Sequence, residues 1–302
     1  MIMVTGVSGA LGSAILDGLR AEAVIGASSK GAGETVRRAD FDRPETLAEA
    51  FAGVRVLVFV SAGYAEDDVV LARHGAVVRA AAAAGVDHVI YTSLAGSGER
   101  LSIALAHRWT EARLAEAPFD VTVLRNGLYA ELAAGMALAG AASAARTGVF
   151  TAPLGDGRLS VVARADLAAV AVRVAAEAWS DVTAGAPRRH AGRTYELEGV
   201  DAVGGHDLAR ALADALDRPV EYRTAPLGDL RPMLAGLEAY QAGHTISTFA
   251  NVNAGLLEAA HSDLPPLLDT PPLPVRDLIT AAVTAGLPAR HPADLPGRLS
   301  SR

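Results

Sequence analysis

Two kinds of hydrophobic pattern alternate along the first part of the chain. Short uninterrupted runs of apolar and β-branched residues are typical of strands that are buried on both faces of a sheet. Apolar residues that recur every three or four positions are typical of helices that pack on such a sheet. The runs predict a strand from Met1 to Gly6 and strands at 24–27, 35–39, 54–61, 86–93 and 121–125, and the spaced pattern predicts helices at 13–20, 44–52, 67–84 and 102–116.

The pattern changes after Asn126. An Ala- and Gly-rich helical pattern runs to Arg146, and a turn-rich segment follows at 148–158. Beyond Gly204, helical segments alternate with Pro-rich connections. Between these stretches, the pattern predicts a short strand and helix at 161–175 and a strand at 194–198.

Regular alternation of strand and helix predicts an α/β fold with a doubly wound parallel sheet of the Rossmann type. We expect this sheet domain to comprise residues 1–130 and about 160–180. A smaller, mostly helical domain, about 131–159 and 181–302, is expected to close over the carboxyl ends of the strands.

Composition limits the kinds of partner. The chain of 302 residues is 51% apolar and carries a formal charge of −7, without the clustered Lys and Arg that nucleic-acid binding requires. It has no cysteine, so disulfides and thiolate catalysis are excluded, and its histidines lack metal-ligand spacing. The apolar stretch 132–145 is too short to span a bilayer, and a first strand that begins at Met1 predicts no signal peptide. We expect a cytoplasmic protein with no metal, membrane or nucleic-acid partner.

A glycine-rich turn joins the first strand to the first helix. Gly6, Gly9 and Gly12 form the pattern G-x-x-G-x-x-G. Glycines at such a turn let the backbone bend tightly and approach a ligand, and the free N–H groups of the helix then face an anionic pyrophosphate. The predicted dinucleotide site comprises Gly6, Ser8, Gly9, Ala10, Leu11 and Gly12.

The end of the second strand indicates which dinucleotide is preferred. NAD-specific proteins usually place an acidic residue there, against the ribose 2′-hydroxyl. Here the sequence is Ala27-Ser28-Ser29-Lys30, with no acid, two hydroxyls and the only lysine of the chain. A 2′-phosphate requires hydrogen-bond donors and positive charge, so NADPH is favoured over NADH. An ordinary polar loop is the alternative interpretation.

The ends of the next strands supply the rest of the predicted cofactor site. Asp40 is placed to accept a hydrogen bond from the adenine amino group, and Phe41 packs either against the adenine ring or in the core. Small residues after the fourth strand let a ribose pass close to the backbone, and hydroxyls of the fifth strand lie near the nicotinamide ribose. These residues are Ser61, Ala62, Gly63, Thr92 and Ser93, and Asn126 follows at the sixth strand.

Five motifs occur along the chain in this order: Thr5–Gly12, Ala39–Phe41, Tyr91–Leu94, Val123–Tyr129 and Ala163–Ala168. Together they resemble the NmrA-like branch of the atypical short-chain dehydrogenase/reductases, and within it the type 2 NAD(P)H:quinone oxidoreductases, as far as about Gly199. The resemblance implies NADP(H) binding, hydride transfer to a quinone and a C-terminal domain that forms the substrate pocket.

One position departs from those reductases. His107, Thr110 and Glu111 match their pattern, but Ala112 stands where they carry a lysine, so the role of that lysine does not transfer. Nor does any tyrosine of the chain have a lysine four residues later, which excludes the usual Tyr/Lys general acid. A quinone tolerates this lack, because hydride addition yields a delocalised, weakly basic hydroquinone anion that solvent can protonate.

Position in the predicted fold indicates the residues near the reacting atoms. Tyr129 is expected to donate a hydrogen bond to a quinone oxygen or to pack under the second domain. His107 and Glu111 share one helix face, which predicts either an oriented catalytic imidazole or a surface pair. Predicted substrate contacts are Leu94, Tyr129, Phe249, Asn251 and Asn253.

Three functions stay open. The first is an NADPH-dependent quinone reductase, acting on a respiratory, xenobiotic or aromatic polyketide quinone, where the hydroquinone would prime a partner oxygenase. The second is a dinucleotide sensor without turnover, which acts by contacting a transcription factor. The third is a ketone or imine reductase with Tyr129 or His107 as acid. The Ala-rich helix 67–84 suits either a homodimer or packing within the chain.

Overall fold

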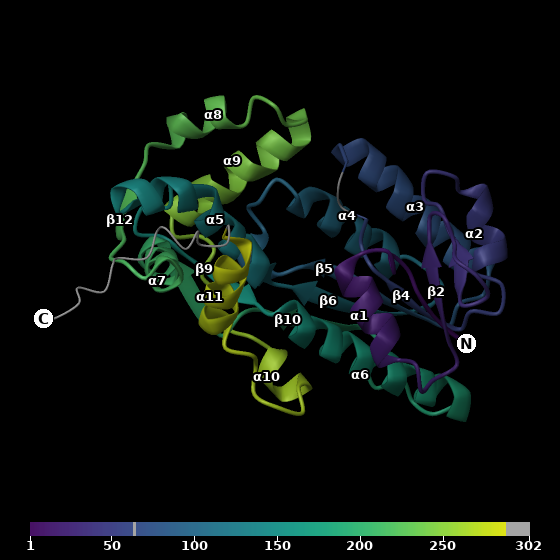
Figure 1. Cartoon of the computed structure of the whole chain (residues 1–302). Helices are drawn as coiled ribbons and strands as arrows, with labels where there is room; N and C mark the ends of the chain where they lie inside the picture. The colour runs from purple at the N-terminus through teal and green to yellow at the C-terminus, as the bar shows by residue number, and fades with distance from the viewer. Residues whose placement is uncertain (63–64, 288–302) are drawn as a thin grey trace, which may run out of the picture.

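A seven-stranded sheet forms the centre of the computed structural model, which describes residues 1–62 and 65–287. Its strand order is β10-β6-β5-β4-β1-β2-β3, and every neighbouring pair is parallel (Figure 1). The strands are β1 Ile2–Val4, β2 Val24–Ser28, β3 Val36–Arg38, β4 Val56–Phe59, β5 His88–Leu94, β6 Asp120–Asn126 and β10 Arg193–Leu197. The predicted doubly wound parallel α/β fold is confirmed.

Helices cover both faces of this sheet. One face carries α1 (Ala10–Gly18) and α6 (Arg164–Ala184), and the other carries α2 (Glu45–Ala50), α3 (Asp67–Ala83) and α4 (Ala104–Ala115) (Figure 1). Because both faces are covered, β4 and β5 are buried along their whole length. Helix α3 packs against α4, which is the packing within the chain that its Ala-rich sequence allowed, and pairing with a second copy stays a prediction.

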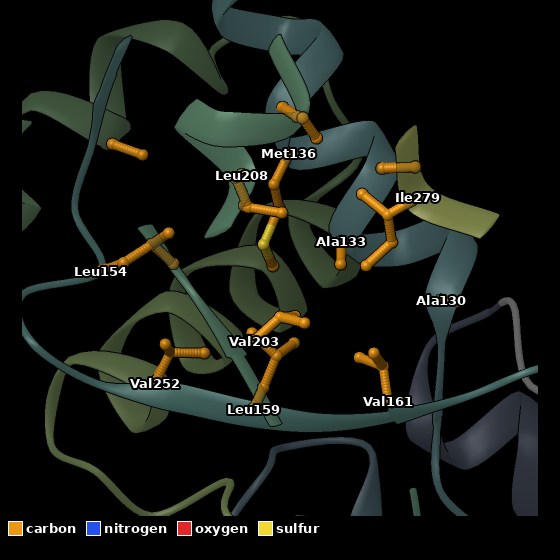
Figure 2. Packing of buried hydrophobic residues seen from close by; sticks show 14 of the residues in the cluster. Ala130, Ala133, Met136, Leu154, Leu159, Val161, Val203, Leu208, Val252 and Ile279 are labelled. Carbon is orange, nitrogen blue, oxygen red and sulfur yellow. The ribbon is translucent and has the colours of Figure 1, made fainter. Parts of the chain in front are cut away.

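A second hydrophobic core lies beyond the carboxyl ends of the strands. It is formed by α5 (Ala130–Thr147), α7 (Gly205–Leu216) and α11 (Val275–Gly286), which pack on one another. Figure 2 shows Ala133 of α5 beside Ile279 of α11, with Met136 of α5 beside Leu208 of α7. Small residues along α5 allow this close approach: a Cβ at Gly140 would meet the ring of Phe150.

Two small sheets and several short helices complete this part. The first sheet joins β7 (Leu128–Tyr129), β9 (Arg158–Val162) and β11 (Asp201–Gly204), and the second joins β8 (Val149–Ala152) and β12 (Glu221–Thr224). The remaining elements are η1 Gly96–Gly98, η2 Leu227–Asp229, α8 Leu230–Met233, α9 Ala239–Asn253 and α10 Leu264–Leu267. Within residues 1–62 and 65–287, no helix has both the length and the apolar character needed to cross a membrane.

The structure differs from the sequence-based expectation in three places. Residues 148–158 were expected to be turns, but they hold β8 and the start of β9. Strands β7, β11 and β12 were not predicted at all. Strand β10 was expected in the second domain, yet it pairs with β6 at the edge of the main sheet. The division into two domains otherwise stays a prediction.

Candidate functional site

The glycine turn after β1 shows a different constraint at each glycine. Gly6 has a φ of +65°, a left-handed conformation that favours glycine. A Cβ at Gly12 would collide with the carbonyl of Gly6 and lie 2.9 Å from the carbonyl oxygen of Thr5. A Cβ at Gly9 would meet only the carbonyl oxygen of Gly6, at an ordinary 3.4 Å. The protein itself therefore requires glycine at positions 6 and 12, whereas position 9 is open on its outer side.

The N-terminus of α1 is exposed at this turn. Ser8, Gly9 and Ala10 are exposed, and the N-cap residue Gly9 provides no side-chain hydrogen bond to the first turn of the helix. The N–H groups of a first helical turn lack partners within the helix, and the helix dipole places positive charge beside them. Such a helix N-terminus suits an anionic group, and binding of the pyrophosphate here stays a prediction.

The ends of β2 and β3 form the next part of the site. The hydroxyl of Ser28 accepts a hydrogen bond of 3.1 Å from the N–H of Gly31, which holds the loop in a tight turn. Ser29 and Lys30 extend from this turn and are exposed. The structure therefore places Lys30 at the end of β2, as the sequence predicts, with its ammonium group open to solvent.

Asp40 and Phe41 follow β3 directly. The N–H of Asp40 donates to Oγ1 of Thr46 at 2.9 Å, and Oδ1 of Asp40 accepts from the N–H of Asp42 at 3.1 Å. Phe41 is half-buried and makes an edge contact with Phe59, with ring centroids 5.9 Å apart. The structure thus shows Phe41 in contact with a core residue. That its ring also packs against adenine stays a prediction.

Beyond β4, backbone groups are held by buried side chains. The N–H of Ser61 donates to Oγ1 of Thr92 at 3.0 Å, and the N–H of Ala62 donates to Nε2 of His74 at 3.1 Å. Burial lowers the pKa of His74 to about 3, so this imidazole is neutral. Its Nδ1–H then donates to Thr110 at 2.8 Å. Gly63, also predicted in the site, lies outside the described residues.

His74 was missed as a site residue by the sequence analysis. It was one of several scattered histidines, and only the fold shows that helix α3 brings its ring under the loop that follows β4. A buried histidine on a helix gives no sequence signal for such a contact. His74 holds the backbone of Ala62, since its ring accepts from that N–H on one side and donates to Thr110 of α4 on the other.

Ser93 leads into a network of charged side chains at the end of β5. Its hydroxyl donates to Oε1 of Glu111 at 2.5 Å. Arg125 contacts the same carboxylate through Nη2 at 2.6 Å, and its Nη1 reaches Glu196 of β10 at 2.8 Å. Arg108 adds a further hydrogen bond to Glu111 at 2.7 Å. We call Ser93, Arg108, Glu111, Arg125 and Glu196 the locked cluster.

The charges of the locked cluster compensate one another. Burial alone would raise the pKa of Glu111, but hydrogen bonds from Arg125 and Ser93 and the charge of Arg108 outweigh it and lower this pKa. The hydrogen bond with Glu111 raises the pKa of Arg125 above its ordinary range. Both groups therefore stay ionised, and the hydroxyl of Ser93 is committed to Glu111.

His107 and Tyr91 form a separate pair beneath the same strand ends. The Tyr91 hydroxyl and Nδ1 of His107 share a hydrogen bond of 3.0 Å. Burial lowers the pKa of His107 to about 4 and raises the pKa of Tyr91. Glu111, which the sequence placed on the same helix face as His107, instead binds Arg125. The structure does not bring His107 and Glu111 together as an oriented pair.

Tyr129 lies at the C-terminal end of β7. Its half-buried ring carries the guanidinium of Arg164, with Cζ 5.1 Å from the ring centroid, and Arg164 pairs with Glu131 at 3.3 Å. Tyr129 packs against the core on the α1 side of the sheet, which includes Leu11 of the glycine turn. Burial is the main cause that raises the pKa of Tyr129, so its phenol keeps its proton. Asn126, the last residue of β6, is buried.

The predicted substrate contacts are scattered. Leu94 and Phe249 both pack on the second core. The side-chain amide of Asn251 donates to the carbonyls of Ser247 at 2.8 Å and Arg100 at 3.4 Å, which ties α9 to the loop before α4. Asn253 is exposed at the end of α9. The structure therefore gives Leu94 and Phe249 packing roles and leaves their contact with a substrate a prediction.

Two carboxylates hold the loop that follows β5. Oε2 of Glu196 accepts from the N–H of Gly96 at 2.8 Å, and Glu198 accepts from both the N–H and the hydroxyl of Ser97 at 2.9 Å. The sequence analysis missed both residues, although acids inside the predicted strand 194–198 are an available signal. In the described part of the chain, no group of three or more His, Cys, Asp or Glu residues could hold a metal ion.

Comparison with known proteins gives consistent matches. A family model described as NAD(P)H-binding matches residues 13–178, more than half of the chain. Quinone oxidoreductase 2 of Escherichia coli (strain K12) is 34% identical over 247 residues, which cover 78% of this chain and 81% of that protein.

Two solved structures are similar over nearly the whole chain. The NADPH complex of an NADPH-dependent quinone oxidoreductase from Escherichia coli has a TM-score of 0.79 and 30% identity, covering 93% of this chain and 99% of that one. The NADP(H) complex of triphenylmethane reductase from Citrobacter sp. also has a TM-score of 0.79, with 26% identity over 95% of this chain and 99% of that one.

Proposed function

Since the chain belongs to the family of NAD(P)H-binding proteins whose model matches residues 13–178, we propose that it is an NADPH-dependent reductase that transfers a hydride directly to a quinone. Bound NADPH supplies the hydride, which carries two electrons. The quinone gains this hydride and one proton from solvent and becomes the hydroquinone, and NADP⁺ is released. The 34% identity to quinone oxidoreductase 2 supports this choice of acceptor.

The observation that carries the proposal is that, among the described residues at the strand ends, no tyrosine is paired with a lysine. The only lysine, Lys30, follows β2, several strands away from β5 and β6. The Tyr91 hydroxyl is buried against His107. A ketone requires an acid for its strongly basic alkoxide, whereas a hydroquinone anion is weakly basic. This difference favours a quinone over a ketone.

Each part of the proposed site has a limited task. The open backbone at Gly9 and the N-terminus of α1 bind the pyrophosphate. Ser28, Ser29 and Lys30 lie toward the 2′-phosphate, and Asp40 lies toward adenine. Thr92 and His74 fix the backbone of Ser61 and Ala62 where the ribose passes. Tyr129, which keeps its proton, donates a hydrogen bond to the quinone oxygen.

Variants of the two candidate acids test this mechanism. We expect Tyr129→Phe combined with His107→Ala to slow quinone reduction by about tenfold at most, since neither residue supplies an essential proton. Loss of a true general acid lowers the rate by about 10²- to 10⁴-fold. Tyr195→Phe is the control, because that tyrosine bonds to His190. A loss beyond about 10²-fold with a quinone would contradict direct transfer without a protein acid.

We propose that the substrate is a tricyclic or tetracyclic aromatic polyketide quinone. Its hydroquinone product would then pass to a partner oxygenase. The family resemblance supports this narrower substrate. Relative kcat/KM values across one-, two-, three- and four-ring quinones test it. The proposal predicts that kcat/KM rises with ring number, and a maximum for one-ring quinones would contradict it.

A dinucleotide-sensing regulator is the second candidate function. The lack of a paired acid supports a sensor as well as a quinone reductase. The two functions differ in turnover: a sensor binds NADPH and NADP⁺ without oxidising NADPH, whatever quinone is offered.

A further inference from the structure

The second arginine of the pair Arg37-Arg38 faces the cofactor side of the sheet. Strand β3 pairs with β2 so that Arg37 lies opposite Ala27 and Arg38 lies opposite Ser28. Partners in a parallel pair point to the same face, and successive residues alternate. A Cβ at Gly26 would meet Leu16 of α1, so Ser28 and Arg38, each two residues beyond the pair Gly26 and Val36, lie on the α1 face.

The two arginines differ in what they bind. Nη1 of Arg37 donates to the carbonyls of Ala50 at 2.7 Å and Ala52 at 2.8 Å, which fixes the C-terminal end of α2. Arg38 has a side chain that is 51% exposed, and its one ion pair in the described residues is to Asp40 at 3.9 Å. Arg37 is therefore committed to the fold, whereas the guanidinium of Arg38 has donors left for a ligand.

A short connection brings Lys30 to the same place. Residues 29–35 join β2 to β3 without a helix, although parallel strands are usually joined by a helical crossover. The N–H of Ala32 donates to the carbonyl of Val36 at 2.9 Å, and a Cβ at Gly31 would lie 3.2 Å from the backbone nitrogen of Arg38. The loop thus folds back against β3.

A hollow of about 690 Å³ opens beside this loop. Lys30, Arg37 and Arg38 line it, and Glu49 is the only acid in its lining. Ala50 and Ala52 of the α2 side complete one wall of the hollow, beside Arg37, whereas Lys30 and Arg38 come from the ends of β2 and β3. A phosphate monoester suits Lys30 and Arg38, because a guanidinium can bind two of its oxygens at once.

We infer that Arg38 is the residue that selects the 2′-phosphate of NADPH, with Lys30 in a supporting role. The inference rests on the cofactor placement in the proposed function, and it assigns selectivity to β3 rather than to the end of β2 alone. Bidentate binding holds the phosphate in one orientation, whereas the mobile ammonium of Lys30 adds attraction without fixing the geometry.

Binding of nucleotides that differ only in the 2′-phosphate tests the inference without any quinone. We would titrate the protein with NADP⁺ and NAD⁺, and with 2′,5′-ADP and 5′-AMP, by calorimetry. Arg38→Ala should weaken NADP⁺ and 2′,5′-ADP by about tenfold or more and leave the other two nucleotides within about twofold. Arg38→Lys should retain part of the affinity, and Lys30→Ala should have a smaller effect than Arg38→Ala.

Arg43→Ala is the matched control, because Arg43 is exposed on the nearby loop and does not line the hollow. It should leave all four affinities unchanged. Equal losses for phosphorylated and unphosphorylated nucleotides in Arg38→Ala would overturn the inference, as would unchanged NADP⁺ binding. Arg38→Gln is the second variant if the alanine variant does not fold. Failure of quinone reduction would leave these binding results unaffected.

Discussion

The two ends of the row of strand termini hold their charges in different ways. At β5, β6 and β10, the locked cluster ties Glu111 to Arg125, and Arg125 to Glu196, at 2.6 to 2.8 Å. At β2 and β3, Lys30 and Arg38 stand exposed, with one long ion pair to Asp40. At the first end, the charged groups are hydrogen-bonded to one another within the fold. At the second end, Lys30 and Arg38 have donors left for a ligand.

This difference matches the tasks proposed for the two ends. Hydride transfer depends on fixed distance and orientation, which a cluster that is already paired can maintain before any ligand arrives. Recognition of a phosphate depends on donors that are not already engaged. The comparison therefore predicts that variants at the locked cluster lose stability, whereas variants at Arg38 lose affinity.

A substitution that breaks the locked cluster should cause the largest loss of folding stability. Glu111→Ala removes a carboxylate whose side chain is 14% exposed and leaves Arg125 with only Glu196. We expect the free energy of unfolding, measured with urea, to fall by about 3 kcal/mol. Glu116→Ala, on the same helix, removes an exposed pair with Arg113 and should change it by less than about 0.5 kcal/mol. Equal losses of stability in Glu111→Ala and Glu116→Ala would show that the locked cluster contributes no more to the fold than an exposed ion pair does.

Acid should also weaken the core of the main sheet. Burial lowers the pKa of His74 to about 3, and of His88 and His107 to about 4, from an ordinary 6.5. Below pH 6.5 the unfolded chain therefore takes up protons that the folded chain does not, so stability falls as pH drops. We expect roughly 1.4 kcal/mol per pH unit for each histidine, between pH 6.5 and about 4.

Urea unfolding at several pH values measures this slope. His107→Gln should reduce this slope, because one of the three histidines with a lowered pKa is gone. His206→Gln, at an exposed histidine, should not. A stability that stays constant from pH 7 to pH 5 would show that the buried imidazoles take up protons in the folded protein.

The next largest effect should come from Gly9→Ala in the glycine turn, which should lower the affinity for NADPH and leave the stability of the fold unchanged. Gly9→Ala adds a methyl group that the protein tolerates, since its nearest neighbour would lie 3.4 Å away. We expect unchanged thermal stability and about tenfold weaker NADPH binding, by fluorescence titration, because the methyl group stands where the pyrophosphate approaches. Gly12→Ala, which collides with the turn itself, should destabilise the fold. Full NADPH affinity in Gly9→Ala would place the pyrophosphate elsewhere.

Arg38→Ala should have the smallest effect on stability. Its half-exposed guanidinium makes one ion pair at 3.9 Å, so we expect the free energy of unfolding to change by less than about 0.5 kcal/mol. Arg125→Ala, at the locked cluster, is the informative contrast. A similar loss of stability in Arg38→Ala and Arg125→Ala would show that Arg38 stabilises the folded protein.

The sequence predicts the parts of the molecule that local pattern determines. Strands β1 to β6 and the helices between them follow from hydrophobic spacing, and the glycine turn follows from its own residues. Strands β8 and β12 were missed because each has only four residues and they pair across a long separation. The place of β10 depends on pairing with β6, which no local pattern records.

Side-chain partners were harder to predict than elements. The spacing of His107 and Glu111 allowed a pair on one helix, but Arg125 from β6 offers Glu111 a charged partner and His107 turns to Tyr91. Arg38 was overlooked because only the register of β3 against β2 shows which face of the sheet it occupies. Such choices depend on contacts between distant segments.

The reaction proposed for this chain is reduction of a quinone by NADPH without a protein acid. We would first follow the loss of NADPH absorbance after mixing with a small naphthoquinone, with NADH in a parallel reaction. We expect rapid oxidation of NADPH, with one hydroquinone formed per NADPH, and slower oxidation of NADH. Tight NADPH binding without oxidation, across quinones of one to four rings, would contradict the proposed reaction and favour a dinucleotide sensor.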